Sequence, residues 1–234
     1  MQLSVFFDSN GVTLHCIECY EQREQIPLII IPGATTTAKD IVNDMYESFP
    51  YYHYVLDMRG KGFSEVPETG YSVENLANDV WSMMQQLDIP KAVVFGYSVG
   101  AGIALELYSQ QPNHIVGVVL GDYPPIYPPF DQEWADRAKQ INPHLHPTFF
   151  EATVRESKFK EFVGVLADMT CPSLLIKGGK EGSLFPNEYI DLFEQTAQKG
   201  QIAILEDSDH DIFMPNSQVL SNVLLNFMKQ INQQ

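Results

Sequence analysis

One serine stands between two glycines at the end of an apolar run, in the stretch Val93-Val94-Phe95-Gly96-Tyr97-Ser98-Val99-Gly100-Ala101-Gly102. This order predicts a buried strand over Ala92–Phe95, a sharp turn over Gly96–Gly100 and an apolar helix that begins at Gly102. A serine held at such a corner leaves no room for side chains two positions before or after it, which explains the glycines. The turn makes Ser98 a candidate nucleophile, and an ordinary glycine-rich turn is the alternative that this stretch alone leaves open.

Length and charge limit the classes of protein to consider. The 234 residues are 44% hydrophobic and 12% aromatic, so the chain can bury a sizeable core as one domain. Its net charge of −16, from 30 acidic and 14 basic residues, argues against nucleic acid and against an anionic membrane surface as partners. The same imbalance disfavours a polyanionic substrate. A small-molecule substrate is the partner that we expect.

Cysteine content and the first residues indicate where the protein works. Three cysteines cannot all pair, and this number is low for a disulfide-stapled secreted protein. Cys16 and Cys19 form a C-x-x-C pattern, but they fall in an alternating run that predicts a strand, where they face opposite sides and stay passive. Met1–Asp8 lacks the basic and long apolar segments of a signal peptide. We therefore expect a cytoplasmic protein.

Strands and helices alternate along the chain. Asn10-Gly11 predicts a hairpin between the first two strands, and the later aliphatic runs are typical of strands buried on both faces of a parallel sheet. The predicted strands are Leu3–Phe7, Val12–Cys19, Pro27–Ile31, Tyr52–Asp57, Ala92–Phe95, Ile115–Leu120, Pro172–Ile176 and Gln201–Leu205. The predicted helices between and after them are Ala38–Ser48, Val73–Asp88, Gly102–Ser109, Asn187–Lys199 and Gln218–Ile231. This alternation predicts an α/β fold with a mostly parallel eight-stranded sheet and helices on both faces.

One segment interrupts the alternation. A proline- and tyrosine-rich run over residues 123–130 is followed by three helix-like pieces, at Gln132–Ile141, Pro147–Glu156 and Phe159–Met169. About 50 residues between two strands is too long for a simple connection. We expect residues 123–172 to form a small helical cap inserted into a core made of residues 1–122 and 173–234.

Three residues of complementary chemistry follow predicted strands. Ser98, Glu181 and His210 each lie in a loop just after a strand, and such loops gather at one edge of a parallel sheet. A serine hydroxyl needs an imidazole to take its proton, and the imidazole needs an anion to fix its tautomer. His144 and His146 are spaced H-x-H with no third ligand nearby, so neither a metal nor a cofactor is expected.

Four motifs in order resemble those of the α/β-hydrolase fold superfamily. They are the turn Gly96–Gly100, the run Asp57–Ser64, the run Pro172–Glu181 and the Asp209-His210 loop. The resemblance extends over nearly the whole chain, and within the superfamily the pattern is similar to small esterase-like, peptidase-like and haloperoxidase-like members with a short cap.

The resemblance implies a role for each matching residue. Ser98 would be the nucleophile, His210 the general base and then acid, and Glu181 the carboxylate that orients the histidine. The backbone N–H groups of Val99 and Ala34 would form the oxyanion hole. Asp57 and Arg59 would brace the loop that ends at Ser64.

Two departures from the family pattern bear on these roles. The family often has His-Gly after the third strand, where this chain has Pro32-Gly33, and it usually has Asp where this chain has Glu181. Asp122, at the end of the preceding strand, is the alternative acid.

The expected reaction is transfer of an acyl group to water, with esters of small to medium neutral or apolar acids as substrates. Aromatic residues before and within the cap are candidates for the pocket lining, although such residues more often pack in a core. They are Tyr97, Tyr123, Tyr127, Phe130, Trp134 and Phe149. The same triad also allows hydrolysis of a carbon–carbon bond or a lyase step that begins with proton abstraction, and a catalytically silent ligand-binding protein is a further alternative.

Overall fold

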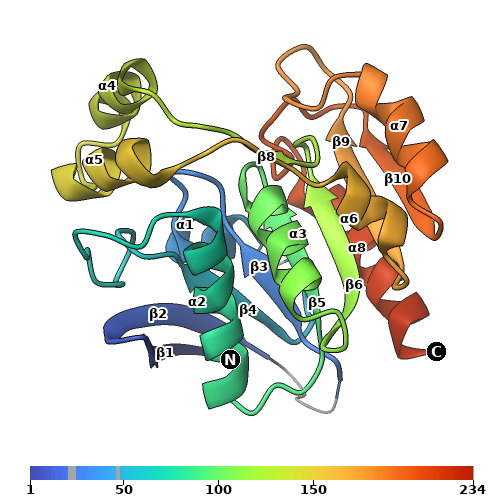
Figure 1. Ribbon diagram of the computed structural model, residues 1–234. Helices are drawn as coiled ribbons and strands as arrows, with labels where there is room; N and C mark the ends of the chain where they lie inside the picture. Colours follow the sequence, from blue (N-terminus) through green and yellow to red (C-terminus); the bar gives the residue numbers. More distant parts are fainter. Residues whose placement is uncertain (21–24, 46–47, 234) are drawn as a thin grey trace.

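Eight strands form one sheet in the computed structural model, which describes residues 1–20, 25–45 and 48–233 (Figure 1). The strand order is β1-β2-β4-β3-β5-β6-β9-β10. Only β2 runs against the other strands, because its pairings with β1 and β4 are antiparallel and the remaining pairings are parallel. The strands are β1 (Gln2–Ser9), β2 (Val12–Cys19), β3 (Leu28–Ile31), β4 (His53–Asp57), β5 (Ala92–Tyr97), β6 (Ile115–Gly121), β9 (Ser173–Gly178) and β10 (Gly200–Leu205). The predicted mostly parallel sheet is confirmed.

Helices cover both faces of the sheet, as predicted. One face carries α2 (Val73–Gln86), α3 (Gly100–Gln110), α6 (Val163–Asp168) and α7 (Glu188–Thr196), and the other carries α1 (Ala38–Met45) and α8 (Ser217–Asn232) (Figure 1). The position of β3 between the two helical layers explains why all of its residues are aliphatic. Ile29 and Ile31 pack into the first layer, Leu28 and Ile30 pack into the second, and all four are inaccessible to solvent.

The ends of several helices differ from the predictions by a few residues. Helix α3 begins at Gly100, two residues before the predicted start, because the elbow leads directly into it. The last predicted turn of the first helix includes residues 46–47, which lie outside the described part of the chain. Among the described residues, no helix combines the length and the hydropathy that crossing a lipid bilayer requires.

The N-terminal hairpin and its cysteines agree with the sequence. Asn10 and Gly11 both have positive φ, 53° and 82°, as the tight turn between β1 and β2 requires. Cys16 packs under the α2 and α3 layer, whereas Cys19 packs under the α1 and α8 layer. Burial raises the pKa of Cys16 to about 12 and that of Cys19 to about 11, so both thiols stay protonated near neutral pH.

Residues 123–172 leave the sheet between β6 and β9. They contain β7 (Ile126–Tyr127), α4 (Gln132–Ile141), α5 (Pro147–Glu156), β8 (Lys160–Glu161) and α6. Strands β7 and β8 pair antiparallel and so join the two ends of the α4–α5 unit. Figure 1 shows α4 and α5 lying together, away from the helices on the sheet.

Only part of this segment stands apart from the core. Helices α4 and α5 share a cluster of buried side chains that includes Ala135, Phe149 and Phe150. Helix α6, in contrast, packs Leu166 into the core layer beside α3. The predicted helix Phe159–Met169 is therefore divided into the short strand β8 and the helix α6.

Candidate active site

The elbow after β5 holds Ser98 in a strained backbone conformation. Its φ is +54°, which a residue with a side chain rarely adopts. The backbone on either side approaches too closely for any side chain, since a Cβ on Gly96 would lie 2.1 Å from the Gly100 carbonyl oxygen and a Cβ on Gly100 would lie 2.4 Å from that of Ile31. Both glycines are therefore required by the turn that presents Ser98.

His210 reaches Ser98 from the loop that follows β10. Its Nε2 lies 3.0 Å from Ser98 Oγ, and its Nδ1 lies 2.9 Å from Asp122 Oδ2. An ionised carboxylate only accepts hydrogen bonds, so this geometry assigns the proton of the neutral ring to Nδ1. Nε2 is then left as the acceptor that faces the Ser98 hydroxyl.

The acid that meets His210 is Asp122, the alternative candidate, and the prediction that Glu181 fills this position is wrong. Asp122 directly follows β6, has a φ of +49° and is fully buried. Its Oδ1 accepts from the Gly178 N–H (2.9 Å) and Ser183 Oγ (2.6 Å), and its Oδ2 also accepts from the Leu184 N–H (2.9 Å). These bonds fix the carboxylate beside the imidazole.

Glu181 lies in an exposed turn, three residues beyond the end of β9. The same turn supplies the Gly178 and Leu184 N–H groups and the Ser183 hydroxyl that hold Asp122. The segment thus contributes hydrogen-bond donors to the acid, while its own carboxylate stays in solvent.

Asp122 is ionised in this setting. Burial alone would raise its pKa, but the hydrogen bonds from His210, Ser183, Gly178 and Leu184 outweigh burial and hold the pKa below its ordinary value. The buried anion therefore supports a positive charge on His210 whenever the ring takes up a second proton.

Two backbone N–H groups border the serine. Gly33, in the loop after β3, lies so close to Ser98 that a Cβ on it would be 3.2 Å from Ser98 Cβ. Within the described ranges, neither the Ala34 N–H nor the Val99 N–H donates a hydrogen bond to a protein acceptor. Pro32 replaces the expected histidine without removing either donor.

Lys61, which the sequence did not single out, supports this loop. Its Nζ donates a hydrogen bond of 2.6 Å to the Gly33 carbonyl oxygen, and the residue is only 4% exposed. Burial lowers the pKa of Lys61 to about 7, while Asp57 and Asp40 raise it. The one feature of the sequence that could have identified Lys61 is its position inside the Asp57–Ser64 turn.

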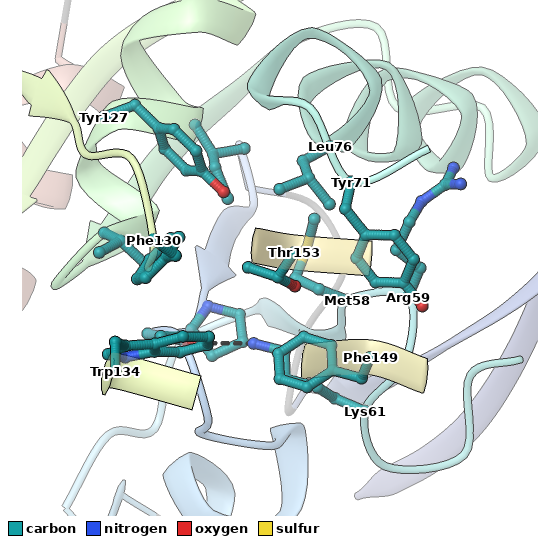
Figure 2. Close-up of a pocket in the computed structure, with 15 residues that line it drawn as sticks. Met58, Arg59, Lys61, Tyr71, Leu76, Tyr127, Phe130, Trp134, Phe149 and Thr153 are labelled. Carbon is teal, nitrogen blue, oxygen red and sulfur yellow. Dashed lines mark hydrogen bonds between the residues drawn. The ribbon is translucent and has the colours of Figure 1, made fainter. Parts of the chain in front are cut away.

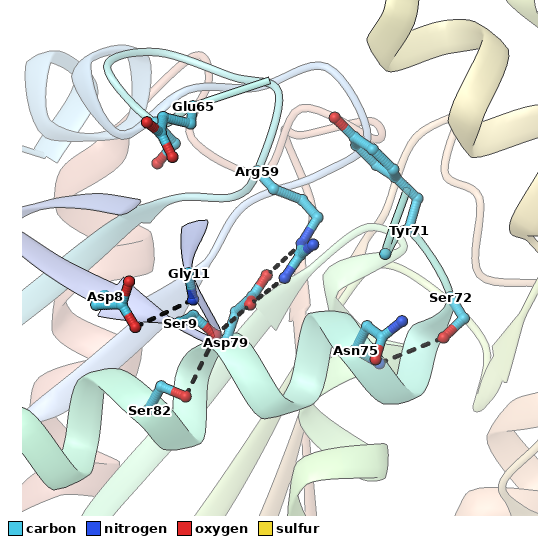
Figure 3. Close-up of polar contacts among 12 residues, drawn as sticks. Asp8, Ser9, Gly11, Arg59, Glu65, Tyr71, Ser72, Asn75, Asp79 and Ser82 are labelled. Carbon is cyan, nitrogen blue, oxygen red and sulfur yellow. Dashed lines mark hydrogen bonds and ion pairs between the residues drawn. The ribbon is translucent and has the colours of Figure 1, made fainter. Parts of the chain in front are cut away.

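Asp57 and Arg59 hold the first part of the Asp57–Ser64 turn. Asp57 accepts from His15 Nδ1 (2.7 Å) and from the Ala38 N–H (2.7 Å). Arg59 forms a buried, two-pronged ion pair with Asp79 of α2 (Figure 3). The expectation that Asp57 and Arg59 brace this loop is consistent with these contacts, and Lys61 follows both residues in the same turn.

A small cavity, here named the cap cavity, lies between this turn, the elbow and helices α4 and α5 (Figure 2). It has a volume of about 30 Å³ and a mostly apolar wall. Both free N–H groups, from Ala34 and Val99, belong to residues of its lining. Four of the aromatic candidates line it as well, namely Tyr127, Phe130, Trp134 and Phe149.

The other two aromatic candidates lie elsewhere. Tyr97 stacks on the His210 ring with centroids 5.3 Å apart, and its hydroxyl donates to the His210 carbonyl oxygen. Tyr123 is half-buried against the core layer of α2 and α3. Tyr97 therefore supports the histidine rather than the cap cavity.

An open groove, here named the outer groove, lies on the other side of the histidine. It has a volume of about 460 Å³ and is lined by His210, Tyr97 and Asn142 together with acidic side chains. These acidic residues are Asp40, Asp44, Asp209 and Asp211.

No group of three metal-ligating side chains occurs within residues 1–20, 25–45 and 48–233. His146 instead caps helix α5, where its Nδ1 accepts from the Thr148 N–H.

Comparison with known proteins gives three kinds of match. A sequence model of the alpha/beta hydrolase fold matches residues 26–160, more than half of the chain. AB hydrolase superfamily protein YfhM of Bacillus subtilis is 27% identical over 169 residues, which cover 66% of this chain and 57% of that protein. The non-heme chloroperoxidase of Streptomyces lividans is 32% identical over 108 residues, or 44% of this chain and 39% of that protein.

The matched regions thus span less than two thirds of either relative. Among solved structures, an esterase from Exiguobacterium antarcticum shares the fold, with a TM-score of 0.80 and 15% sequence identity, over 97% of this chain and 100% of that one. Together with the family match over residues 26–160, this shared fold shows that the chain belongs to the alpha/beta hydrolase fold family.

Proposed function

We propose that this protein is a serine hydrolase that transfers the acyl group of a carboxylic ester, or of a related acyl compound, to water. The observation that carries the proposal is the continuous chain of hydrogen bonds from Ser98 Oγ through His210 to Asp122. Membership in the alpha/beta hydrolase fold family supports it.

The reaction would begin with attack by Ser98 Oγ on the substrate carbonyl carbon while its proton moves to His210 Nε2. The carbonyl oxygen would become an oxyanion bound by the Ala34 and Val99 N–H groups. Collapse of this intermediate breaks the bond to the leaving group, which takes the proton from His210. A water molecule then gives a proton to His210 and attacks the acyl-enzyme, and the acid and the free serine are released.

The Lys61 contact supports the assignment of the Ala34 N–H. In a trans peptide the carbonyl of one residue and the N–H of the next lie in one plane and point in opposite directions. Because Lys61 Nζ holds the Gly33 carbonyl, it also fixes the direction of the Ala34 N–H in the same peptide unit. Lys61 is on these grounds a positioning residue for the oxyanion hole.

The two spaces beside Ser98 would take different parts of the substrate. His210 must protonate the leaving group, and His210 lines the outer groove. The residues that carry the two free N–H groups line the cap cavity. The acyl chain would therefore enter the cap cavity and the leaving group would lie in the outer groove.

A serine-directed fluorophosphonate tests the proposal. We expect covalent labelling of Ser98 in the folded wild-type protein, no labelling of Ser98→Ala, and loss of esterase activity on a panel of short-chain esters in that variant. Ser109→Ala, which alters a serine on α3 whose hydroxyl donates to the Glu106 carbonyl, should keep both activity and labelling. Full esterase activity in Ser98→Ala would contradict the proposal.

A further inference from the structure

Three side chains in the wall of the cap cavity have hydrogen-bond donors that the protein does not use. Tyr71 and Thr153 are 2% and 5% exposed, and their hydroxyls have no partner among the described residues. Lys61 is 4% exposed, and Gly33 is the only described acceptor for its three N–H groups. Figure 2 shows Thr153 and Lys61 among the aromatic rings of the lining.

These unused donors are exceptional in this molecule. Within the described ranges, one other buried side-chain atom lacks a hydrogen-bond partner, Glu106 Oε2, and it forms an ion pair with Lys160 at 2.7 Å. A buried hydroxyl without a partner lowers stability, so its presence calls for a reason such as a ligand. Two such hydroxyls at one cavity, beside a buried ammonium, point to a ligand that accepts hydrogen bonds there.

The chemistry of the donors indicates the class of ligand. An ammonium group only donates and carries a positive charge, and a carboxylate only accepts and carries a negative one. Hydrogen bonds between such charged partners are stronger than those between neutral groups. The net charge of −16 opposes anions at long range, but salt screens this effect beyond about 10 Å, so nearby groups govern binding in the cavity. Lys61 attracts a carboxylate there, and Asp57 and Asp40, which also act on Lys61, oppose it.

The position and size of the cap cavity further restrict the class of ligand. The cavity lies on the acyl side of Ser98, and its volume of about 30 Å³ leaves space for little more than one water-sized group between the rings. A carboxylate end would fill this space, so the carbon chain that carries it must be short, and it enters only when the rings of Phe130 and Trp134 move aside.

We propose that the acyl group of the substrate ends in a carboxylate, bound by Lys61, Tyr71 and Thr153, so that the protein hydrolyses monoesters or related monoacyl derivatives of short dicarboxylic acids. This inference rests on the proposed acyl hydrolysis and narrows its substrate class. It replaces the neutral acyl group that the sequence favoured.

Three matched methyl esters test the inference: monomethyl succinate, its neutral amide analogue methyl succinamate, and its apolar analogue methyl 4-methylpentanoate. We expect kcat/KM to be at least about tenfold higher for monomethyl succinate than for the apolar ester. Tyr71→Phe and Thr153→Val should each lower this ratio by about fivefold or more, and Lys61→Met should abolish the preference. Equal or faster hydrolysis of the apolar ester by the wild type would overturn the inference, and a preference for the amide over the carboxylate would overturn the charge that we assign.

The variants also separate binding from folding. Because the Tyr71 and Thr153 hydroxyls have no partner in the described part of the chain, Tyr71→Phe and Thr153→Val should not lower the melting temperature. The control Tyr108→Phe removes a buried hydroxyl that accepts from the Thr170 N–H, so it should lower the melting temperature and leave the substrate ratio unchanged.

Binding of free succinate to Ser98→Ala, measured by calorimetry, distinguishes this inference from the proposed function. If Ser98→Ala binds succinate, the double variant with Lys61→Met does not, and the wild type hydrolyses no ester, the carboxylate site would be supported and the hydrolase contradicted. Turnover without succinate binding or ester preference would support the hydrolase and contradict the carboxylate site.

Discussion

Asp122 Oδ2 lies 2.9 Å from His210 Nδ1, although 88 residues separate the two in the chain. The strand order explains this proximity. Strand β6 pairs with β9, and β9 pairs with β10, all in parallel. The carboxyl ends of β6 and β10 therefore lie at the same edge of the sheet, with the loop after β9 between them.

Asp122→Asn should lower kcat by roughly 10³-fold to 10⁴-fold, because the amide can donate to Nδ1 and so favours the tautomer that cannot accept the serine proton. Steady-state kinetics on a short-chain ester, with circular dichroism to verify folding, measure the effect. The matched control Glu181→Gln should stay within about twofold of the wild type, since Glu181 is exposed. Equal losses in the two variants would show that the acid is misassigned.

The sequence identified both carboxylates but ranked them wrongly, and the reason is geometric. Asp122 and Glu181 both follow strands at the same edge of the sheet, so strand order alone does not separate them. The choice depends on which loop surrounds which carboxylate. Gly178, Ser183 and Leu184 direct their donors at Asp122, and no periodicity in the sequence encodes that direction.

Lys61→Met should lower kcat on a neutral ester by roughly 10-fold to 100-fold with little change in KM, because the Ala34 N–H loses the contact that fixes its direction. Stopped assays over a range of ester concentrations separate the two constants. Lys180→Met, at an exposed lysine that lies 3.8 Å from Asp207, is the control and should change neither. An unchanged kcat in Lys61→Met would remove Lys61 from the oxyanion hole.

The ratio of kcat/KM for monomethyl succinate to that for methyl 4-methylpentanoate should depend on pH. Burial lowers the pKa of Lys61 to about 7, so the ammonium that binds the carboxylate is lost above this pH. The ratio should fall by about tenfold from pH 6 to pH 8, while the pH dependence of the chemical steps that both substrates share cancels in the ratio.

Other charged and titratable groups lie around Lys61 and bear on this predicted pH dependence. Asp57 and Asp40 raise its pKa, and Arg59 and Tyr71 share its cavity. Arg59 is neutralised by its pairing with Asp79, and burial raises the pKa of Tyr71 well above this range. Lys61→Met is the control, and its ratio of the two kcat/KM values should not change with pH. A flat ratio in the wild type would contradict the role of the ammonium.

The donors of the cap cavity also show what the sequence could and could not predict. The apolar run of β3 and the glycines of the elbow follow from local rules, because each depends on neighbours in the chain. Lys61, Tyr71 and Thr153 come from three separate segments, and they line one cavity because α5 packs over the turn that follows β4. Whether their donors find a protein acceptor depends on how these segments pack, and no single sequence motif encodes that packing.

His53 should make the protein sensitive to acid. Burial lowers the pKa of this histidine from 6.5 to about 4, so between these values the unfolded chain binds a proton that the folded chain does not. The free energy of unfolding should therefore fall with falling pH in this window, by roughly 3 kcal/mol in total from His53. Urea unfolding at pH 7 and pH 4.5 should show a smaller loss in His53→Gln than in the wild type. The exposed His144 provides the control His144→Gln, and equal losses in all three proteins would contradict the assignment.

The elbow glycines should tolerate no side chain. A Cβ on Gly96 or Gly100 would lie within 2.4 Å of backbone oxygen, which cannot move without displacing β5, β3 or α3. Gly96→Ala and Gly100→Ala should each lower the free energy of unfolding by roughly 2–4 kcal/mol and abolish labelling of Ser98. Gly164→Ala is the matched control: Gly164 lies in α6 with nothing within 4 Å of the new Cβ, so alanine should stabilise the protein by about 0.5–1 kcal/mol. Chemical denaturation measures all three variants. An elbow variant as stable and as readily labelled as Gly164→Ala would show that close backbone approach does not hold the serine in place.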